Sequence, residues 1–245
     1  MKIIDMHAHV WLSHDTKSDV RQMRRAAEDN GVTRIFISPL GSHRPDKDEV
    51  EALNMLAKKV CAEHGDLFSR YVYVNPAEEN ALDVLQRGMD EGCVGLKLWI
   101  ATLCNDPCVF PLVEACIKRR FPILLHAFQK TVNGYPAESD GRHVADIAAR
   151  YPDAKFIMAH LGANCYHGVK AVRHLENVYL DFCGSICGAD DLPFAIEQVG
   201  VDRLLFGTDM PGNYHTSAAQ VKDADITDVD REKIFYGNAK TLFGL

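Results

Sequence analysis

Residues 5–9 read DMHAH and lie inside the first apolar segment of the chain. In a regular β-strand every second side chain lies on the same face, which predicts that Asp5, His7 and His9 share one face. Burying three polar side chains on one face costs free energy unless each has a partner. The pattern therefore fits either an exposed strand with a polar face or a strand whose histidines bind a ligand, and only the rest of the chain can separate these two structures.

The composition is that of a globular protein. The chain has 245 residues, of which 47% are hydrophobic and 25% charged, and its formal net charge is −7. No apolar run is long enough for a transmembrane helix, and no Lys/Arg cluster suggests binding to nucleic-acid phosphates. We therefore expect neither a membrane nor a nucleic acid as partner.

The eight cysteines indicate the compartment. Several lie inside apolar patterns instead of a small loop-rich framework, which favours reduced thiols. Polar residues interrupt the apolar segment at the N-terminus, so no secretory signal is predicted there. The pairs Cys104/Cys108 and Cys183/Cys187 lack the spacing of a structural zinc site. These features predict a cytoplasmic protein.

Short apolar runs alternate with helix-like segments along the whole chain. Strands are expected at 2–10, 33–39, 69–75, 94–100, 122–128, 155–161, 178–183 and 203–208, and helices at 17–29, 47–64, 79–91, 109–119, 141–150, 166–175, 190–199 and 230–243. Eight such units predict an α/β fold, a closed (β/α)8 TIM barrel that forms a single domain over residues 1–245. A doubly wound open sheet is the alternative, but no GxGxxG turn follows the first strand.

Polar residues occupy the ends of several predicted strands. They are His7 and His9 on the first strand, Lys97 with Trp99 on the fourth, His126 on the fifth, His160 on the sixth and Asp209 on the eighth. In a (β/α)8 barrel these strand ends meet at one mouth, where active sites lie. Each residue alone has an ordinary structural explanation. Together, several imidazoles and a carboxylate form a ligand set that divalent transition metals prefer, so the sequence predicts a metal site.

These residues lie in motifs that resemble the amidohydrolase superfamily. The resemblance is strongest to its amidohydrolase-related (type 2) branch, which also contains metal-dependent decarboxylases. The motifs are DMHAH, the strand-five His126, AHLG around His160, NVYLDF, LLFGTDMP around Asp209 and REKIFYGNAKTLF. They follow the order of the family from residue 5 to residue 243. The resemblance implies a (β/α)8 barrel that holds a divalent metal, often zinc.

The resemblance also implies roles for individual residues. The implied metal ligands are His7, His9, His126 and Asp209. In members with one metal, the residue at the position of His160 acts on water or substrate, and in members with two it binds the second metal. A strand-four lysine like Lys97 occurs both as a carboxylated bridge between two metals and beside a single one. We expect one Zn²⁺ per chain, and a second metal held by His160 and Lys97 stays open.

The expected mechanism uses Asp209 and His160 as catalytic residues. Asp209 would take a proton from the metal-activated water, and His160 would polarise the scissile carbonyl or move the proton to the leaving group. Asp5 is expected either to support the ligands, since ligating histidines commonly donate their other N–H to a carboxylate, or to have a structural role. Candidate substrate-binding residues in the loops are Trp11, Trp99, Tyr135 and Arg142, with His14 and Asn133 as further pocket candidates. Arg142 would bind a carboxylate.

Three functions remain open on this basis. The leading hypothesis is a metal-dependent hydrolase that cleaves a C–N or C–O bond of an amide, lactone or ester in a small molecule. The alternative is a metal-dependent, non-oxidative decarboxylase of an aromatic or unsaturated carboxylic acid. A metal-binding scaffold or sensor is a third, and the intact ligand set argues against it. The expected partner is a small-molecule substrate, and a homo-oligomer stays open because a barrel surrounded by apolar helices can self-associate.

Overall fold

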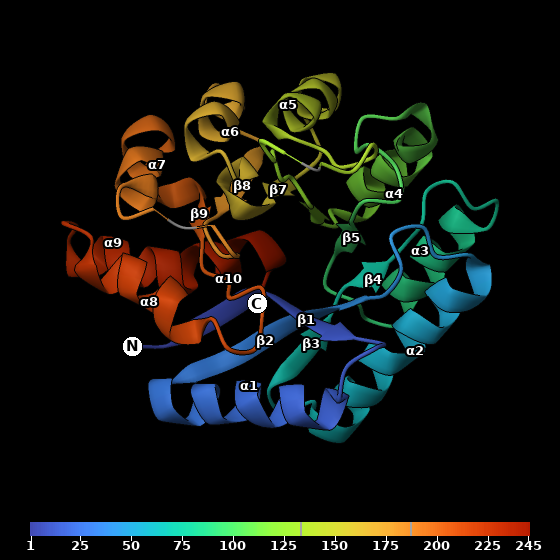
Figure 1. Cartoon of the computed structure of the whole chain (residues 1–245), viewed down its shortest axis with the longest axis horizontal. Helices are drawn as coiled ribbons and strands as arrows, with labels where there is room; N and C mark the ends of the chain where they lie inside the picture. The colour runs from blue at the N-terminus through green and yellow to red at the C-terminus, as the bar shows by residue number, and fades with distance from the viewer. Residues whose placement is uncertain (133, 187) are drawn as a thin grey trace.

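A computed structural model describes residues 1–132, 134–186 and 188–245. Within these ranges all paired strands are parallel. The strands are β1 (Ile3–Trp11), β2 (Val32–Leu40), β3 (Phe68–Arg70), β4 (Val72–Tyr73), β5 (Leu96–Leu98), β6 (Ile123–Leu125), β7 (Phe156–Met158), β8 (Val178–Asp181) and β9 (Leu204–Leu205). Figure 1 shows them at the centre of the molecule, surrounded by helices.

The strands close into a barrel through two junctions. Tyr71 links β3 to β4, so these two segments are halves of one barrel strand that pairs with β2 on one side and with β5 on the other. At the other junction, the Met6 amide donates to the Phe206 carbonyl at 3.0 Å, and Ala8 pairs with Asp209 in a parallel bridge. The predicted (β/α)8 barrel is confirmed.

The helices also follow the prediction, with two exceptions. They are α1 (Thr16–Asn30), α2 (Lys47–His64), α3 (Ala81–Asp90), α4 (Phe110–Arg119), α5 (Gly141–Arg150), α6 (Cys165–Val172), α7 (Asp191–Val199), α8 (Tyr214–Asp223), α9 (Asp228–Glu232) and α10 (Asn238–Phe243). The sequence did not predict α8, because Ser217 and Ala218 occupy half of its buried face and give a weak apolar period. The predicted helix 230–243 is divided by a π-helical turn, Lys233–Gly237.

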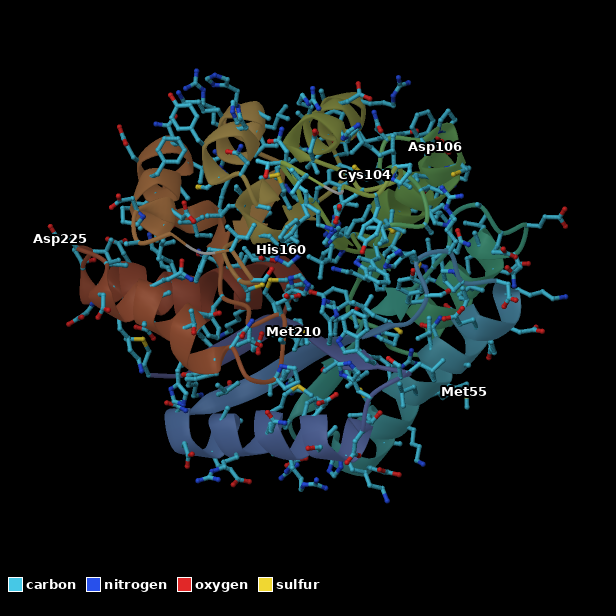
Figure 2. All side chains as sticks on the ribbon, viewed as in Figure 1. Met55, Cys104, Asp106, His160, Met210 and Asp225 are labelled. Atoms are coloured by element: carbon cyan, nitrogen blue, oxygen red, sulfur yellow. The ribbon has the colours of Figure 1, made fainter. Side chains whose placement is uncertain are left out.

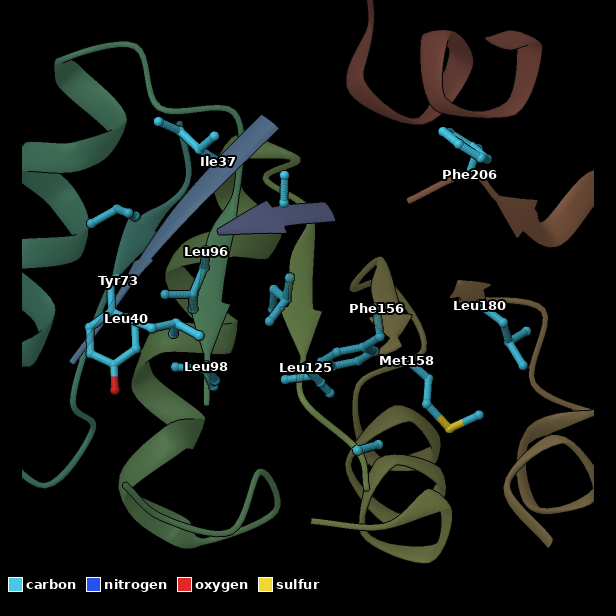
Figure 3. Packing of buried hydrophobic residues seen from close by; sticks show 14 of the residues in the cluster. Ile37, Leu40, Tyr73, Leu96, Leu98, Leu125, Phe156, Met158, Leu180 and Phe206 are labelled. Atoms are coloured by element: carbon cyan, nitrogen blue, oxygen red, sulfur yellow. The ribbon is translucent and has the colours of Figure 1, made fainter. Parts of the chain in front are cut away.

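Two buried layers form the core. Ile4, Phe36, Leu124, Ile157 and Leu205 fill the inside of the barrel. A larger layer lies between the strands and the helices, and Figure 3 shows part of it, including Leu96, Leu125, Phe156 and Leu180. Strand residues alternate between these layers, as expected for strands that are covered on both faces. The side chain between Leu96 and Leu98 is therefore directed into the barrel.

A β-bulge in β1 changes the faces of the DMHAH stretch. The register between β1 and β2 shifts between Asp5 and Ala8, where β1 contains one residue more than β2. A bulge of this kind reverses the alternation of side chains. His7 and His9 consequently face the inside of the barrel, whereas Asp5 faces outward beside Met23 of α1. The prediction that Asp5 shares a face with the two histidines is wrong.

Two further observations concern the cysteines and the hydropathy of the helices. None of the seven cysteines in the described ranges forms a disulfide, and Cys187 lies outside those ranges. Among the described residues, no helix has both the length and the apolar character to cross a membrane.

Candidate active site

Three predicted ligands converge at the carboxyl ends of β1 and β9. His7 Nε2 lies 3.0 Å from His9 Nε2, and His9 Nε2 lies 3.1 Å from Asp209 Oδ1. The distance from His7 Nε2 to the same oxygen is 3.8 Å. The two histidines are buried, and the Asp209 side chain is 17% exposed. The barrel closure between β1 and β9 therefore creates a compact group of two imidazoles and one carboxylate.

The hydrogen bonds of the two rings show which nitrogens face one another. His7 Nδ1 lies 2.8 Å from an oxygen of Asp181, and His9 Nδ1 lies 3.1 Å from the Ser38 carbonyl. Burial lowers the pKa of both histidines, that of His7 to well below its usual value. In each neutral ring, Nδ1 must carry the proton because its partner accepts. The two Nε2 lone pairs then point at one another and at the carboxylate, an arrangement that a divalent cation stabilises.

Lys97 is the cationic side chain beside this group. It is completely buried inside the barrel, and its Nζ lies 3.2 Å from His7 Nε2. Burial lowers its pKa to about 8, although the nearby Asp209 and Asp181 carboxylates oppose this shift. The structure thus places the strand-four lysine against the predicted ligands.

The fourth predicted ligand, His126, lies apart from this group. In the described part of the chain, two groups of three or more residues have ligand atoms that all lie within 4.8 Å of one another, and His126 belongs to neither: they are His7, His9 and Asp209, and His7, His160, Asp181 and Cys183. His126 Nε2 lies 3.1 Å from Glu138 Oε1. Burial lowers the pKa of His126 to about 3, so the ring is neutral and Nε2 carries the proton that Glu138 accepts. In this conformation Nε2 does not offer a lone pair to a metal.

The two predicted catalytic residues share an uncommon backbone conformation. His160 has a φ of 61° and Asp209 a φ of 66°, both in the left-handed region that non-glycine residues rarely adopt. The His160 amide donates to Asp181 Oδ1 at 2.8 Å, and the Asp209 amide donates to the His7 carbonyl at 2.6 Å. Strained backbone that neighbouring contacts hold in place concentrates at functional sites, which supports the predicted role of both residues.

The surroundings of Asp209 set its charge, and a hydrogen bond fixes the ring of His160. Burial raises the pKa of Asp209, but the neighbouring His160, His9 and His7 lower it more, so that it lies well below its usual value and the carboxylate stays ionised. His160 Nδ1 lies 2.8 Å from the Cys183 carbonyl and donates to it. This bond leaves Nε2 as the ring nitrogen available to the cavity. Figure 2 shows His160 and Met210 near the centre of the barrel.

A cavity of about 370 Å³ opens over these residues. Four aromatic side chains line it, together with polar residues from three loops: Trp11, Trp99, Phe128 and Tyr135, and His43, Lys130, Glu138 and Ser185. The Trp11 and Trp99 rings meet edge to face with centroids 5.7 Å apart, and Lys130 Nζ lies 4.2 Å from the centre of the Tyr135 ring. This size and lining suit a small, flat molecule.

Not all predicted pocket residues reach the cavity. Trp11, Trp99 and Tyr135 line it, but Arg142 does not. The Arg142 side chain is 79% exposed and pairs with Asp140 at 2.7 Å, because it lies in the first turn of α5, which Asp140 caps. His14 stacks on Trp11 but lines a separate groove between α1 and α2. Asn133 lies outside the described residues.

Of the two roles predicted for Asp5, the contacts show the structural one. Its carboxylate accepts hydrogen bonds from the Thr208 hydroxyl at 2.7 Å and from the Thr208 amide at 3.1 Å. It therefore ties β1 to the segment that follows β9 and helps close the barrel. Burial raises its pKa to about 7. The carboxylate that receives a ring N–H from a ligand is Asp181 and not Asp5.

Sequence reasoning missed two carboxylates of the site. Asp181 ends an apolar strand, the same signal that identified His126, but it received no role. Glu138 lies in the long loop between β6 and α5, where no periodic pattern marks it. Its carboxylate also binds Lys130 Nζ at 2.9 Å.

Comparison with known proteins defines the class. The Amidohydrolase family model matches residues 4–245, so the chain belongs to the amidohydrolase family. Among curated proteins, it is 30% identical over 118 residues to the gamma-resorcylate decarboxylase of Polaromonas sp. strain JS666. This match covers 39% of the chain and 36% of that relative, so the chain spans about a third of its length.

Solved structures of decarboxylases share the fold. The 2,6-dihydroxybenzoate decarboxylase from Rhizobium has a TM-score of 0.76 and 18% identity, with 100% of this chain and 99% of that one covered. The dihydroxybenzoic acid decarboxylase from Polaromonas sp. JS666, solved with manganese and the inhibitor 2-nitroresorcinol, has a TM-score of 0.74 and 21% identity over 100% and 97%. At these identities the likeness establishes the TIM-barrel fold alone.

Proposed function

We propose that the protein is a metal-dependent, non-oxidative decarboxylase of a small aromatic hydroxy acid. The named activities of similar proteins support decarboxylation over the hydrolysis that the sequence favoured. The aromatic lining of the cavity is consistent with a ring-shaped substrate. The observation that most supports a metal-dependent enzyme is the 3.0 Å distance between the unprotonated Nε2 atoms of His7 and His9, beside the Asp209 carboxylate.

His7, His9 and Asp209 fit a divalent metal and would hold it, with His126 as the proposed fourth ligand. When bound, the metal supplies Lewis-acid polarisation of the substrate oxygens. Zinc was the expectation from sequence, but manganese in the Polaromonas structure makes it the first ion to load. A single ion per chain is proposed, with Lys97 uncarboxylated and His160 free to act on the substrate.

Decarboxylation breaks the bond between the ring and the carboxylate, and the ring carbon takes a proton as carbon dioxide leaves. Asp209 is ionised and faces the cavity, so it is suited to accept a proton from a ring hydroxyl. His160 is suited to pass a proton to carbon: its Nδ1 keeps its own proton in the bond to the Cys183 carbonyl, and Nε2 would take up the proton that Asp209 removed from the hydroxyl and give it to the ring carbon. The aromatic side chains that line the cavity are suited to pack against the ring of the substrate.

We also propose a cellular compartment and a binding partner for the protein. A cytoplasmic location is supported by the seven unpaired cysteines of the described ranges. The proposed partner is a small-molecule substrate, and a homo-oligomer remains a prediction.

The test is a substrate panel on manganese-loaded and zinc-loaded protein. The panel contains hydroxybenzoates, including 2,6-dihydroxybenzoate, and matched lactones, esters and amides. Release of carbon dioxide with stoichiometric loss of the acid supports the proposal. Turnover of lactones, esters or amides without carbon dioxide, and none of any acid, contradicts it and favours the hydrolase. A variant at Asp209 controls for contaminating activity.

A further inference from the structure

Asp181 is placed between the metal site and His160. It lies at the end of β8, and its side chain is completely buried. One oxygen, Oδ2, accepts from His7 Nδ1 at 2.8 Å. The other, Oδ1, accepts from the His160 amide at 2.8 Å and from the Cys183 thiol at 3.1 Å. One carboxylate therefore contacts both a proposed metal ligand and a proposed proton donor.

Each of these bonds fixes a property that the chemistry needs. The bond to His7 keeps the proton on Nδ1 and leaves Nε2 unprotonated beside His9, Asp209 and Lys97. The bond to the His160 amide helps hold that residue in its left-handed conformation. That conformation directs the ring into the cavity, where Gly184 leaves room for it: a Cβ on Gly184 would lie 2.7 Å from His160 Nδ1.

We propose that Asp181 is a positioning residue that sets the metal-binding tautomer of His7 and the conformation of His160 at the same time. This inference rests on the proposed function, since it requires a metal between His7, His9 and Asp209. Only a carboxylate serves both sides, because both of its oxygens accept hydrogen bonds. An asparagine at this position has one acceptor and one donor. An asparagine therefore cannot accept hydrogen bonds from both His7 Nδ1–H and the His160 amide in these positions.

A second interpretation of the same atoms makes a different prediction. His7, His160, Asp181 and Cys183 lie close enough together to hold an ion of their own. The contacts favour hydrogen bonding instead, because an ion there would displace the bond between His7 and Asp181 and require a thiolate. Replacing the Cys183 sulfur by oxygen distinguishes the two, since a serine hydroxyl still donates to Asp181 but, unlike a thiol, does not ionise to an anionic metal ligand.

The experiment measures Mn²⁺ binding to the wild type, Asp181→Asn and the matched control Cys183→Ser from the electron paramagnetic resonance signal of free Mn²⁺. The melting temperature of each metal-free protein is recorded in parallel. We expect Asp181→Asn to weaken Mn²⁺ binding roughly 10- to 100-fold while its metal-free melting temperature stays within about 4 °C. Cys183→Ser should bind within about twofold of wild type because the donor is kept.

A measurement on the wild type covers the case in which Asp181→Asn does not fold. Long-range ¹⁵N–¹H correlation spectra report which ring nitrogen of His7 carries the proton, and the proposal requires Nδ1 in the metal-free protein.

Several results would overturn the inference: equal Mn²⁺ affinity in Asp181→Asn and wild type, an Nε2–H tautomer at His7, or loss of Mn²⁺ binding in Cys183→Ser alone. If the wild type itself binds no metal, the proposed function fails first, so the two failures are distinguishable.

Discussion

The two sides of the cavity are built in different ways. On the metal side, His7, Lys97 and Asp181 project from strands inside the barrel and are completely buried. On the opposite side, Lys130, Tyr135 and Glu138 come from one loop between β6 and α5, and Tyr135 is 44% exposed. Strands hold side chains more rigidly than loops do. We therefore propose that the metal side performs the chemistry and that the loop side selects the substrate.

The largest effect is expected on the metal side. Replacing Asp209 with Asn keeps a residue that tolerates the left-handed backbone but removes the negative charge and the proton acceptor. We expect the rate of carbon dioxide release to fall about 1,000-fold with little change in the thermal stability of the metal-free protein. Steady-state kinetics and thermal unfolding check this. Near wild-type turnover in Asp209→Asn would remove Asp209 from the mechanism.

A smaller effect is expected on the loop side. Tyr135→Leu removes an aromatic wall that contacts His43 and Lys130 but leaves the metal group unchanged. KM should rise about tenfold, the amount that one aromatic contact contributes, while the Mn²⁺ affinity is unchanged. If the Mn²⁺ affinity of Tyr135→Leu fell by as large a factor as its KM rose, the two sides would not be independent.

The neutral state of His126 gives a pH-dependent prediction. Its pKa is about 3 in the folded protein against 6.5 in a model compound, so the unfolded chain binds a proton at a higher pH than the folded one. The contribution of His126 to stability is therefore complete above pH 6.5 and is lost as the pH falls.

The measurement compares metal-free wild type with His126→Asn by urea unfolding at two pH values. Between pH 7 and pH 5.5, the wild type should lose about 1 kcal/mol relative to the variant. A constant difference between the two proteins would mean that His126 is not buried in its neutral form.

The smallest effect is expected at Arg142, which the sequence suggested as a carboxylate clamp. Its side chain is exposed and pairs with Asp140 outside the cavity. Arg142→Ala should change kcat/KM less than about twofold. A tenfold rise in KM for the acid would restore the sequence-based hypothesis and show that α5 moves toward the substrate.

The contrast between the two sides also explains what could be predicted from sequence. Strands covered on both faces read as short apolar runs, so a polar residue at the end of such a run, like His160 or Asp209, is conspicuous. The same signal was available for Asp181. The β-bulge in β1 leaves no such signal, because it depends on how β1 pairs with β2. That pairing decides that Asp5 faces outward.

The sequence contains fewer recognisable patterns for the loop side. Trp11 and Trp99 lie at or just beyond strand ends, and both line the cavity. Glu138 and Arg142 lie only four residues apart, and composition alone does not tell which one faces inward. The N-terminal cap of α5 decides it, because Asp140 binds the Arg142 side chain and backbone outside the cavity.

The most direct test of the metal site is the metal content of the purified chain. Wild type and His9→Ala are loaded with Mn²⁺ or Zn²⁺, dialysed and analysed for metal per chain. A site formed by His7, His9 and Asp209 predicts one tightly bound equivalent in the wild type and none in His9→Ala. Two equivalents, with a carboxylated Lys97, would contradict the single ion. No metal in the wild type, or equal amounts in both proteins, would contradict the site itself.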